Sequence, residues 1–240
     1  MISVVVTMAG ESRRFREAGY QVPKYRVEVH GRSLFAWSVR SLARILDRAG
    51  LVVFVGLAAD PGLPSFLERE CAAAGIARYE LISLDERTDG QATTALAAGP
   101  ALEKTDPLVV YNIDTYVEPA SLDPALMRDD GWIPCFPGEG DHWSFVAARP
   151  DGRVTEVAEK VRISPHATVG LYGFGSFELF EEAYRRGRPA GEPGRAERYI
   201  APLYNDVVAA GGTVWMSPVP TQSVHPLGTP AEVAAFASGS

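Results

Sequence analysis

The chain opens with the segment ISVVVTMAGESRRF (residues 2–15), and Pro-Lys follows at positions 23 and 24. The β-branched run over 2–7 is typical of a strand buried on both faces of a parallel sheet. Gly10 follows this run, and a glycine there permits a tight turn and a close approach of a ligand to the backbone. Because guanidinium groups fork onto phosphate oxygens, the arginines beyond Gly10 favour a phosphate-binding loop. Taken alone, the segment is equally compatible with an exposed basic surface.

Strand-like and helix-like segments alternate from this strand to about residue 114. After a loop over 8–23, we expect helices over 34–46, 60–74 and 91–98, the first capped by Ser33, and strands over 51–55, 78–84 and 108–111. This alternation predicts βαβ units and a parallel sheet, in which ligands bind at the carboxyl ends of the strands. The loop after Thr7, Gly90 and Asp114 all follow strands, so we expect them to meet in one crevice.

Short strands become more frequent after about residue 131. We expect them over 132–136, 143–149, 154–158, 168–174 and 213–219, with helices over 176–185 and 195–210. Asp151-Gly152 lies between two strand-like runs and is a good hairpin signal. Thr229 is a suitable cap for a last helix. The second half is therefore expected to complete the sheet and to add a second lobe.

The composition argues against several classes of protein. A formal net charge of −7 does not favour general nucleic-acid binding, which calls for a basic face. Cys71 and Cys135 lack the CxxC spacing of a zinc or redox site, so we expect buried free thiols. No apolar run reaches the ~20 residues that span a bilayer. Because the first strand begins almost at Met1, a signal peptide has no room, and we expect a cytoplasmic protein without a membrane partner.

Lysine is rare in this chain. Of the 23 basic residues only Lys24, Lys104 and Lys160 are lysines. Where arginine is the usual cation, a lysine suggests a position that suits a compact ammonium group, and this points to Lys24 and Lys160. Arg26, close to Lys24, has no assigned role. Glu159-Lys160 is equally compatible with an exposed charge pair at a strand end.

Two further motifs carry side chains suited to a nucleotide. Gly90-Gln91-Ala92 opens a predicted helix, where a polar side chain can read a base edge or simply cap the helix. Asp114 follows a buried strand and Asn112. A carboxylate there can hold Mg²⁺, which takes one or two carboxylates plus phosphate oxygens, although a lone Asp is commonly a turn or cap residue.

Residues 7–15 with Pro23-Lys24 resemble the N-terminal segment of the sugar-phosphate nucleotidyltransferases. The similarity is greater still to a bacterial branch with a Met-Ala-Gly loop, found among capsule and small-metabolite enzymes. The chain departs from that branch at Ser12, where glycine is usual, and at Arg13. The resemblance implies an α/β fold, a Rossmann-like three-layer sandwich of the GT-A-like kind with a mixed, mostly parallel sheet. It implies one domain over 1–240, with a nucleotide-binding half to about 130 and an acceptor-binding half from about 131.

The resemblance also implies roles for individual residues. Catalysis falls to Arg14, Lys24 and Asp114, and Asp114 also holds the Mg²⁺ ion. Nucleotide binding falls to Met8, Ala9, Gly10, Glu11, Ser12, Arg13, Gly90, Gln91, Ala92 and Asn112. Acceptor binding falls to Glu159, Lys160, Val169, Gly170 and Tyr172. The family often has a second carboxylate near the C-terminus, but none precedes the LGTP motif at 227–230, which leaves His225 or water as the second ligand.

The implied reaction joins a nucleoside triphosphate to a phosphorylated small molecule, foremost a sugar 1-phosphate, with release of pyrophosphate. The nucleobase and the acceptor remain open, and a homodimer is the default assembly. Three alternatives stay open as well. They are a cytidylyltransferase for a non-sugar phosphate or phosphonate, a GT-A-type glycosyltransferase, and a non-catalytic nucleotide-binding protein.

Overall fold

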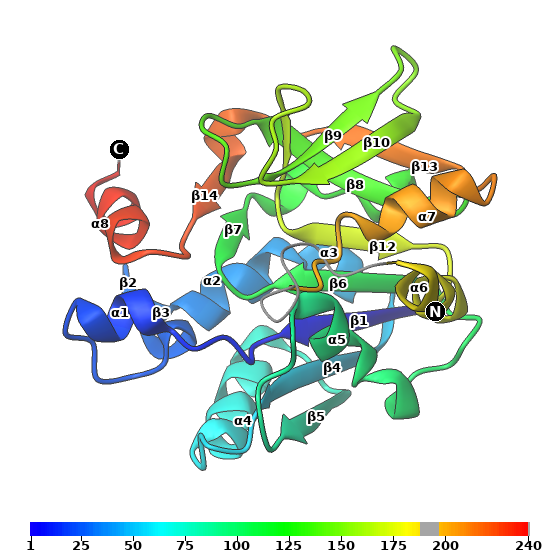
Figure 1. Ribbon diagram of the computed structural model, residues 1–240. Helices are drawn as coiled ribbons and strands as arrows, with labels where there is room; N and C mark the ends of the chain where they lie inside the picture. Colours follow the sequence, from blue (N-terminus) through cyan, green and yellow to red (C-terminus); the bar gives the residue numbers. More distant parts are fainter. Residues whose placement is uncertain (188–196, 240) are drawn as a thin grey trace.

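The computed structural model describes residues 1–187 and 197–239. Within these residues one ten-stranded sheet runs through both halves of the chain, in the order β10-β9-β11-β8-β12-β6-β1-β4-β5, and β13 pairs with β8 (Figure 1). Its strands are β1 (Ile2–Thr7), β4 (Ala49–Leu57), β5 (Tyr79–Leu84), β6 (Leu108–Asn112), β8 (Gly131–Pro137), β9 (Ser144–Ala148), β10 (Val154–Glu159), β11 (His166–Thr168), β12 (Leu171–Phe174) and β13 (Val214–Pro218).

The first half of the chain contributes a parallel block. Strand β1 lies between β4 and β6, parallel to both, and β5 extends the block beyond β4. Val4, Val5 and Val6 are fully buried because both faces of β1 are covered. The second half joins through β12, which is antiparallel to β6 and β8. The mixed sheet is thus confirmed, with its parallel character concentrated in the first half and in the β8–β13 pair.

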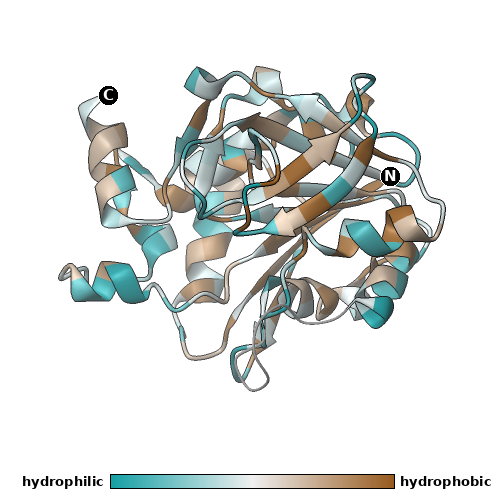
Figure 2. Cartoon of the chain, turned by 45° about the horizontal axis from the view of Figure 1, so that its top comes forward, coloured by the Kyte–Doolittle hydropathy of each residue, from teal (hydrophilic) through white to brown (hydrophobic). Residues whose placement is uncertain are grey.

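Two helical layers cover the sheet, as expected for a three-layer sandwich. One face is packed by α2 (Leu34–Ser41), α3 (Ala43–Leu46) and α4 (Leu63–Ala74). The other face is packed by α5 (Gln91–Leu96), α6 (Phe177–Arg186) and α7 (Leu203–Ala209). Figure 2 shows the hydrophobic residues mainly along the strands and the hydrophilic ones on peripheral helices and loops. Burial of these apolar faces is the main favourable term that holds the layers together.

The smaller elements gather beside the sheet. They are α1 (Arg13–Glu17), β2 (Glu28–Val29), β3 (Arg32–Ser33), β7 (Thr115–Val117), β14 (Val224–Pro226), α8 (Pro230–Ser238) and the 3-10 turns η1 (Lys24–Arg26), η2 (Gly99–Ala101), η3 (Pro119–Ser121), η4 (Pro124–Leu126) and η5 (Thr221–Ser223). A third apolar cluster includes Phe15, Leu34, Tyr116, Leu227 and Val233. This cluster packs the C-terminal helix α8 close to α1 although the two are far apart in sequence (Figure 1).

Several predicted boundaries need correction. The loop expected over 8–23 contains helix α1, because Phe15 is buried at 1% exposure and pulls that turn onto the core. The helix expected from residue 60 begins at Leu63, since the Asp60 carboxylate accepts from the Gly62 amide instead. The helix expected over 34–46 is interrupted at Leu42. The strand expected over 168–174 is divided at Gly170, whose φ of +78° is a left-handed conformation.

The helix expected over 195–210 is much shorter than predicted. Residues 195 and 196 lie outside the described residues, and α7 begins only at Leu203. The backbone of Arg198 pairs with the Gly90 loop, because Arg198 N donates to Asp89 O at 3.0 Å and Ala92 N donates to Arg198 O at 2.9 Å. These bonds hold the segment out of a helix.

Other local predictions are confirmed. The Ser33 hydroxyl accepts from the Ala36 amide, and the Thr229 hydroxyl accepts from the Glu232 amide, so both residues cap helices. Strands β9 and β10 pair as the hairpin that Asp151-Gly152 predicted. Cys71 and Cys135 are buried free thiols. No helix among the described residues is long and apolar enough to cross a membrane.

Candidate active site

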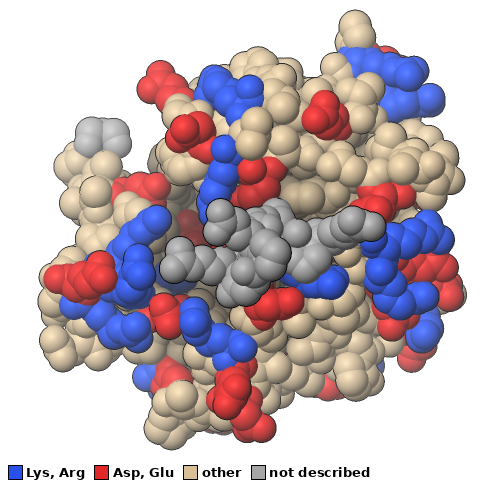
Figure 3. Space-filling view, viewed as in Figure 1, with Lys and Arg blue, Asp and Glu red and all other residues tan. Residues whose placement is uncertain are grey.

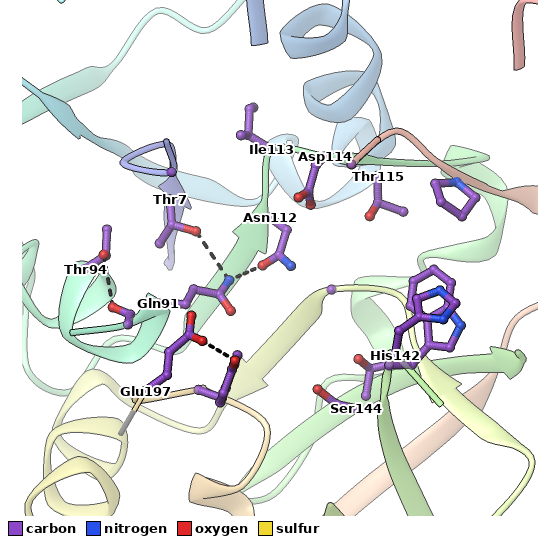
Figure 4. A pocket seen from close by; sticks show the side chains of 18 of the residues that line it. Thr7, Gln91, Thr94, Asn112, Ile113, Asp114, Thr115, His142, Ser144 and Glu197 are labelled. Atoms are coloured by element: carbon purple, nitrogen blue, oxygen red, sulfur yellow. Dashed lines mark hydrogen bonds between the residues drawn. The ribbon is translucent and has the colours of Figure 1, made fainter. Parts of the chain in front are cut away.

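A cavity of about 450 Å³ lies at the carboxyl ends of β1 and β6. Figure 4 shows Asn112 and Asp114 on one side of it and His142 and Ser144 across from them. Most of the residues singled out in the sequence line this cavity: Ala9, Gly10, Arg14, Lys24, Gly90, Gln91, Asn112, Asp114, Glu159, Val169, Gly170 and Tyr172. The fold therefore brings the Gly10 loop, the Gly90 loop and the strand-end carboxylate into one crevice.

The remaining predicted residues lie outside the lining. Met8 and Ala92 are buried in the core. The other residues outside the lining are Glu11, Ser12, Arg13 and Lys160. Glu11 forms an ion pair of 3.2 Å with Arg87, which does line the cavity. Figure 3 shows lysines and arginines gathered over α1, the helix that carries Arg13 and Arg14. Of these two, only Arg14 lines the cavity.

Lys24 and Asp114 form the central ion pair of the cavity. Lys24 Nζ lies 2.7 Å from Asp114 Oδ2, and the side chains are only 17% and 28% exposed. Lys24 begins turn η1, whereas Asp114 lies between β6 and β7, so the pair joins the Gly10–Lys24 loop to the parallel sheet. A partly shielded pair interacts more strongly than a surface pair, because less water screens it.

Ser12 fixes the loop that carries Lys24. Its backbone is left-handed at φ 54°, a conformation that costs a residue other than glycine about 1 kcal/mol. A glycine would adopt this conformation without that cost. The Ser12 hydroxyl accepts from the Lys24 amide at 2.9 Å, so serine supplies a bond that glycine lacks.

An amide cluster lies beside the Gly10 loop. Gln91 Nε2 donates to Asn112 Oδ1 and, at 3.3 Å, to Thr7 Oγ1, as the dashed lines in Figure 4 show. Gly170 packs against this cluster, because a Cβ added there would lie 3.0 Å from Asn112 Nδ2. The ends of β1 and β6, the start of α5 and the turn at Gly170 thus hold two amide side chains at the cavity wall. Amide groups offer both donors and acceptors, as reading a base edge requires.

Glu159 faces the cavity from the end of β10. Its side chain is 11% exposed and accepts from the Ser144 hydroxyl. Burial raises the pKa of Glu159, an effect that the Ser144 hydroxyl and Lys160 oppose and that Glu197 reinforces. The Tyr172 hydroxyl lies 3.1 Å from Thr168 Oγ1 on the same wall. This wall therefore presents hydroxyl groups and a shielded carboxylate.

Lys160 lies next to this wall but turns toward Tyr199. Its Nζ donates to the Tyr199 hydroxyl at 2.5 Å and lies 3.9 Å from Glu159 Oε1. The Tyr199 hydroxyl in turn donates to Glu197. Both Glu197 and Tyr199 line the cavity, so this chain of contacts connects Lys160 to it.

Gly90 is one of the places where the two halves are in close contact. A Cβ added to Gly90 would lie 2.4 Å from the carbonyl oxygen and 2.5 Å from the amide nitrogen of Arg198, closer than real atoms approach. The Asp89 and Arg198 side chains also lie 3.6 Å apart as an ion pair. The segment that carries Glu197 and Tyr199 is therefore seated directly on the Gly90 loop.

A second carboxylate, missed in the sequence, lies near Asp114. A Cβ added to Gly228 would lie 3.4 Å from Asp114 Oδ2 and 3.5 Å from Glu232 Oε2, so both carboxylates border the space above this glycine. The resemblance implies a carboxylate before the LGTP motif, whereas Glu232 follows this motif in the first turn of α8. His225 instead stacks on Tyr116 at 5.4 Å and does not line the cavity.

Other lining residues carried no clear signal in the sequence. They are Thr7, Arg87, Thr88, Thr94, Ile113, Thr115, His142, Trp143, Ser144, Thr168, Pro226, Gly228, Thr229 and Glu232. Ser144 and Thr168 belong to no recognisable sequence motif. Only the pairing of β9 and β11 with their neighbours turns these side chains toward the cavity. Within residues 1–187 and 197–239 no three His, Cys, Asp or Glu side chains cluster as a complete metal-binding group.

Taken together, a glycine loop with basic side chains, an amide cluster and a carboxylate pair at the ends of parallel strands define an α/β enzyme of the nucleotidyl-transferring class. No family model and no curated protein matches the sequence. Among solved structures, the nucleoside-diphosphate-sugar pyrophosphorylase from Vibrio cholerae RC9 is 32% identical with a TM-score of 0.88, over 99% of this chain and 100% of that one. The chain belongs to the sugar-phosphate nucleotidyltransferase family.

A more distant structure shares the fold. The inositol-1-phosphate CTP transferase from T. maritima is 14% identical with a TM-score of 0.76, over 96% of this chain and 90% of that one. At this identity the likeness shows the fold alone. The predicted three-layer α/β fold and the predicted enzyme class are both confirmed.

Proposed function

We propose that this chain transfers a nucleotidyl group from a nucleoside triphosphate to a sugar 1-phosphate, with release of pyrophosphate. One observation carries the proposal: a single cavity is lined both by Gly10, Arg14 and Lys24 and by Glu159 and Tyr172. The first set suits a triphosphate and the second suits a hydroxylated acceptor. The name of the similar Vibrio cholerae protein, a nucleoside-diphosphate-sugar pyrophosphorylase, describes the same exchange.

The reaction needs little covalent chemistry from the protein. An oxygen of the acceptor phosphate attacks the α-phosphorus, the bond from that phosphorus to the bridging oxygen breaks, and pyrophosphate leaves. Because the attacking oxygen is already anionic, no strong general base is required. Catalysis then consists of positioning and charge neutralisation. Lys24 and Arg14 would neutralise the triphosphate and the departing pyrophosphate, since both line the cavity as cations.

The chemistry of the carboxylates fits a magnesium ion. Asp114 and Glu232 offer hard oxygen donors around the space above Gly228. Two carboxylates suffice, because Mg²⁺ completes its coordination with substrate phosphates and water. Asp114 and Glu232 would hold the ion, and Mg²⁺ when bound would offset negative charge on the phosphates. The contact of Lys24 Nζ with Asp114 Oδ2, at 2.7 Å, supports the view that this carboxylate is ionised and attracts cations.

The acceptor would bind against the wall formed by the second half of the chain. Glu159 and Ser144 present oxygen atoms that bind sugar hydroxyls, and Glu159 is shielded enough for such bonds to be strong. Val169 and Gly170 form the turn beside them. Lys160 would act from the edge, either on the acceptor or through Tyr199.

A pyrophosphate-release screen tests this function. Four nucleoside triphosphates are each incubated with Mg²⁺ and a panel of sugar 1-phosphates, polyol phosphates and phosphonates. Pyrophosphate released only when both a triphosphate and an acceptor are present supports the proposal, and the productive pair identifies the base and the acceptor. Triphosphate binding without turnover on any acceptor would point to a binding protein. Turnover of nucleotide sugars without pyrophosphate would point to a glycosyltransferase.

A further inference from the structure

Three groups converge on the carboxylate of Asp60, on the loop between β4 and α4. Arg26 Nη2 donates to both of its oxygens, at 2.7 and 2.8 Å, and the Tyr25 hydroxyl donates to Oδ2. The Gly62 amide donates to Oδ1 at 3.1 Å. The Asp60 side chain is 19% exposed and that of Arg26 is 24% exposed, so this is a partly buried network and not a surface ion pair.

Two of these groups belong to the turn that carries Lys24. Turn η1 comprises Lys24, Tyr25 and Arg26, and its last two side chains reach Asp60 while Lys24 reaches Asp114. The Tyr25 ring packs on Phe66 at 5.5 Å, and the Arg26 guanidinium lies 5.1 Å above the same ring. One side of the turn is therefore held by the Asp60 carboxylate before helix α4 and by the Phe66 ring on it.

The space for this network depends on Gly62. A Cβ added to Gly62 would lie 3.0 Å from both terminal nitrogens of Arg26, so a larger residue would push the guanidinium away. On the other side, the Lys24 amide donates to the Ser12 hydroxyl. The backbone that carries Lys24 is thus bound from two directions, by Asp60 and by Ser12.

We propose that Asp60 is a positioning residue for Lys24: by binding Tyr25 and Arg26 it fixes turn η1, so that the Lys24 ammonium is held at the phosphate end of the cavity. This inference rests on the proposed function. Asp60 is not among the residues that line the cavity, so it acts through the turn. Displacement of a charged group by about 1 Å can cost up to 10²-fold in rate, so a fixed turn matters for turnover.

A double-mutant cycle tests this role. Asp60→Asn keeps the shape of the side chain but removes the charge that Arg26 binds, and it is measured in the native chain and in a Lys24→Ala chain. We expect Asp60→Asn to lower kcat on the order of tenfold in the native chain, with little change in the KM of the acceptor. In the Lys24→Ala chain the same change should cost little more, because the group it positions is gone.

Glu70→Gln is the matched control. Glu70 lies on α4 and accepts from the Ser33 hydroxyl at 2.8 Å, and none of its described contacts reaches turn η1. It should leave turnover unchanged in both chains. If Asp60→Asn lowers turnover by the same factor in both chains, Asp60 has a general structural role and the proposal is overturned.

Two further measurements keep the test decisive. If Asp60→Asn does not fold, Tyr25→Phe and Arg26→Lys each weaken the same network and should show the same dependence on Lys24.

If the native chain releases no pyrophosphate with any acceptor, the proposed function fails. The cycle is then measured on triphosphate affinity by calorimetry. Loss of affinity only where Lys24 is present supports the positioning role, and equal losses in both chains overturn it.

Discussion

The Lys24 ammonium donates to the Asp114 carboxylate at 2.7 Å, and it joins two residues that the sequence assigns to different partners. Lys24 was expected to meet a phosphate and Asp114 to hold a metal ion. With each neutralising the other, the partly buried cavity holds no isolated charge at this point, which would be costly. Under the proposed function, phosphates and Mg²⁺ entering together would give each side chain a new partner of opposite charge.

Lys24→Ala should lower turnover by ~10²-fold, because a charge contact that acts in the transition state is lost. The matched control is Arg16→Ala, an exposed residue of α1 outside the cavity lining, which should retain near-normal turnover. Arg26→Ala, which seemed from the sequence to be a neutral comparison, is not one, because Arg26 binds Asp60. Equal and slight losses in Lys24→Ala and Arg16→Ala would mean that the loop is only a basic surface.

Asp114→Ala should remove Mg²⁺-dependent turnover and leave the fold intact. The motivation is a carboxylate at the end of β6, inside the cavity and beside a cationic group. Rates are measured against Mg²⁺ concentration, and circular dichroism checks the fold. Glu156→Gln, an exposed carboxylate on β10, serves as the control and should behave as the native chain. Ordinary Mg²⁺ dependence in Asp114→Ala would refute the assignment.

Glu232→Gln should weaken metal binding without abolishing triphosphate binding. The amide is a poorer ligand for Mg²⁺ than a carboxylate, while Asp114 would remain in place. Affinity for Mn²⁺ as a spectroscopic substitute is measured by electron paramagnetic resonance, with triphosphate present. Glu182→Gln on α6 is the control, since its carboxylate pairs only with Arg186 among the described contacts. Unchanged Mn²⁺ affinity in Glu232→Gln would mean that Glu232 does not bind the metal together with Asp114.

Lys160→Ala should raise the KM of the acceptor, lower kcat, or both, and leave triphosphate affinity nearly unchanged. Lys160 contacts Glu159 and Tyr199, which line the cavity. Lys104→Ala is the control, because Lys104 is also an exposed lysine paired with a glutamate, Glu181. Calorimetry without acceptor measures the triphosphate. Weakened triphosphate binding with normal acceptor kinetics would show that the two halves of the site are reversed.

Glu159→Gln should lower acceptor turnover and raise the stability of the fold at pH 7. Burial raises the pKa of Glu159 above its ordinary value of 4.5, so ionising this group in the folded chain is unfavourable. Its stabilising contribution is present below pH 4.5 and is lost as the pH rises through the raised pKa. Glu159→Gln should therefore unfold at higher urea than the native chain at pH 7, but not below pH 4, while acceptor turnover falls. If the variant and the native chain have the same urea midpoint at pH 7 as well as below pH 4, this account is contradicted.

The sequence indicated those features that depend on local pattern. Gly10 follows the buried β-branched run of β1, and Asp114 follows β6, so their meeting at one sheet edge could be predicted. Glu232 could not be placed, because its approach to Asp114 depends on how the third apolar cluster packs α8. Asp60 read as a helix start, and its link to Arg26 arises only when α4 packs beside turn η1. The segment around Arg198 was predicted as helix, because its backbone bonds to Asp89 and Ala92 join residues far apart in the chain and leave local helix propensity unchanged.

The close contact between Gly90 and Arg198 constrains how this chain can be recombined with related chains. The Arg198 backbone bonds to Asp89 and Ala92, which flank Gly90, and a Cβ at Gly90 would clash with the Arg198 backbone. A chimera crossed over near residue 130 would take the Gly90 loop from one parent and the segment around Arg198 from the other. Under the proposed function, a hybrid keeps the fit between the Gly90 loop and the segment that carries Glu197 and Tyr199 only when both come from the same parent.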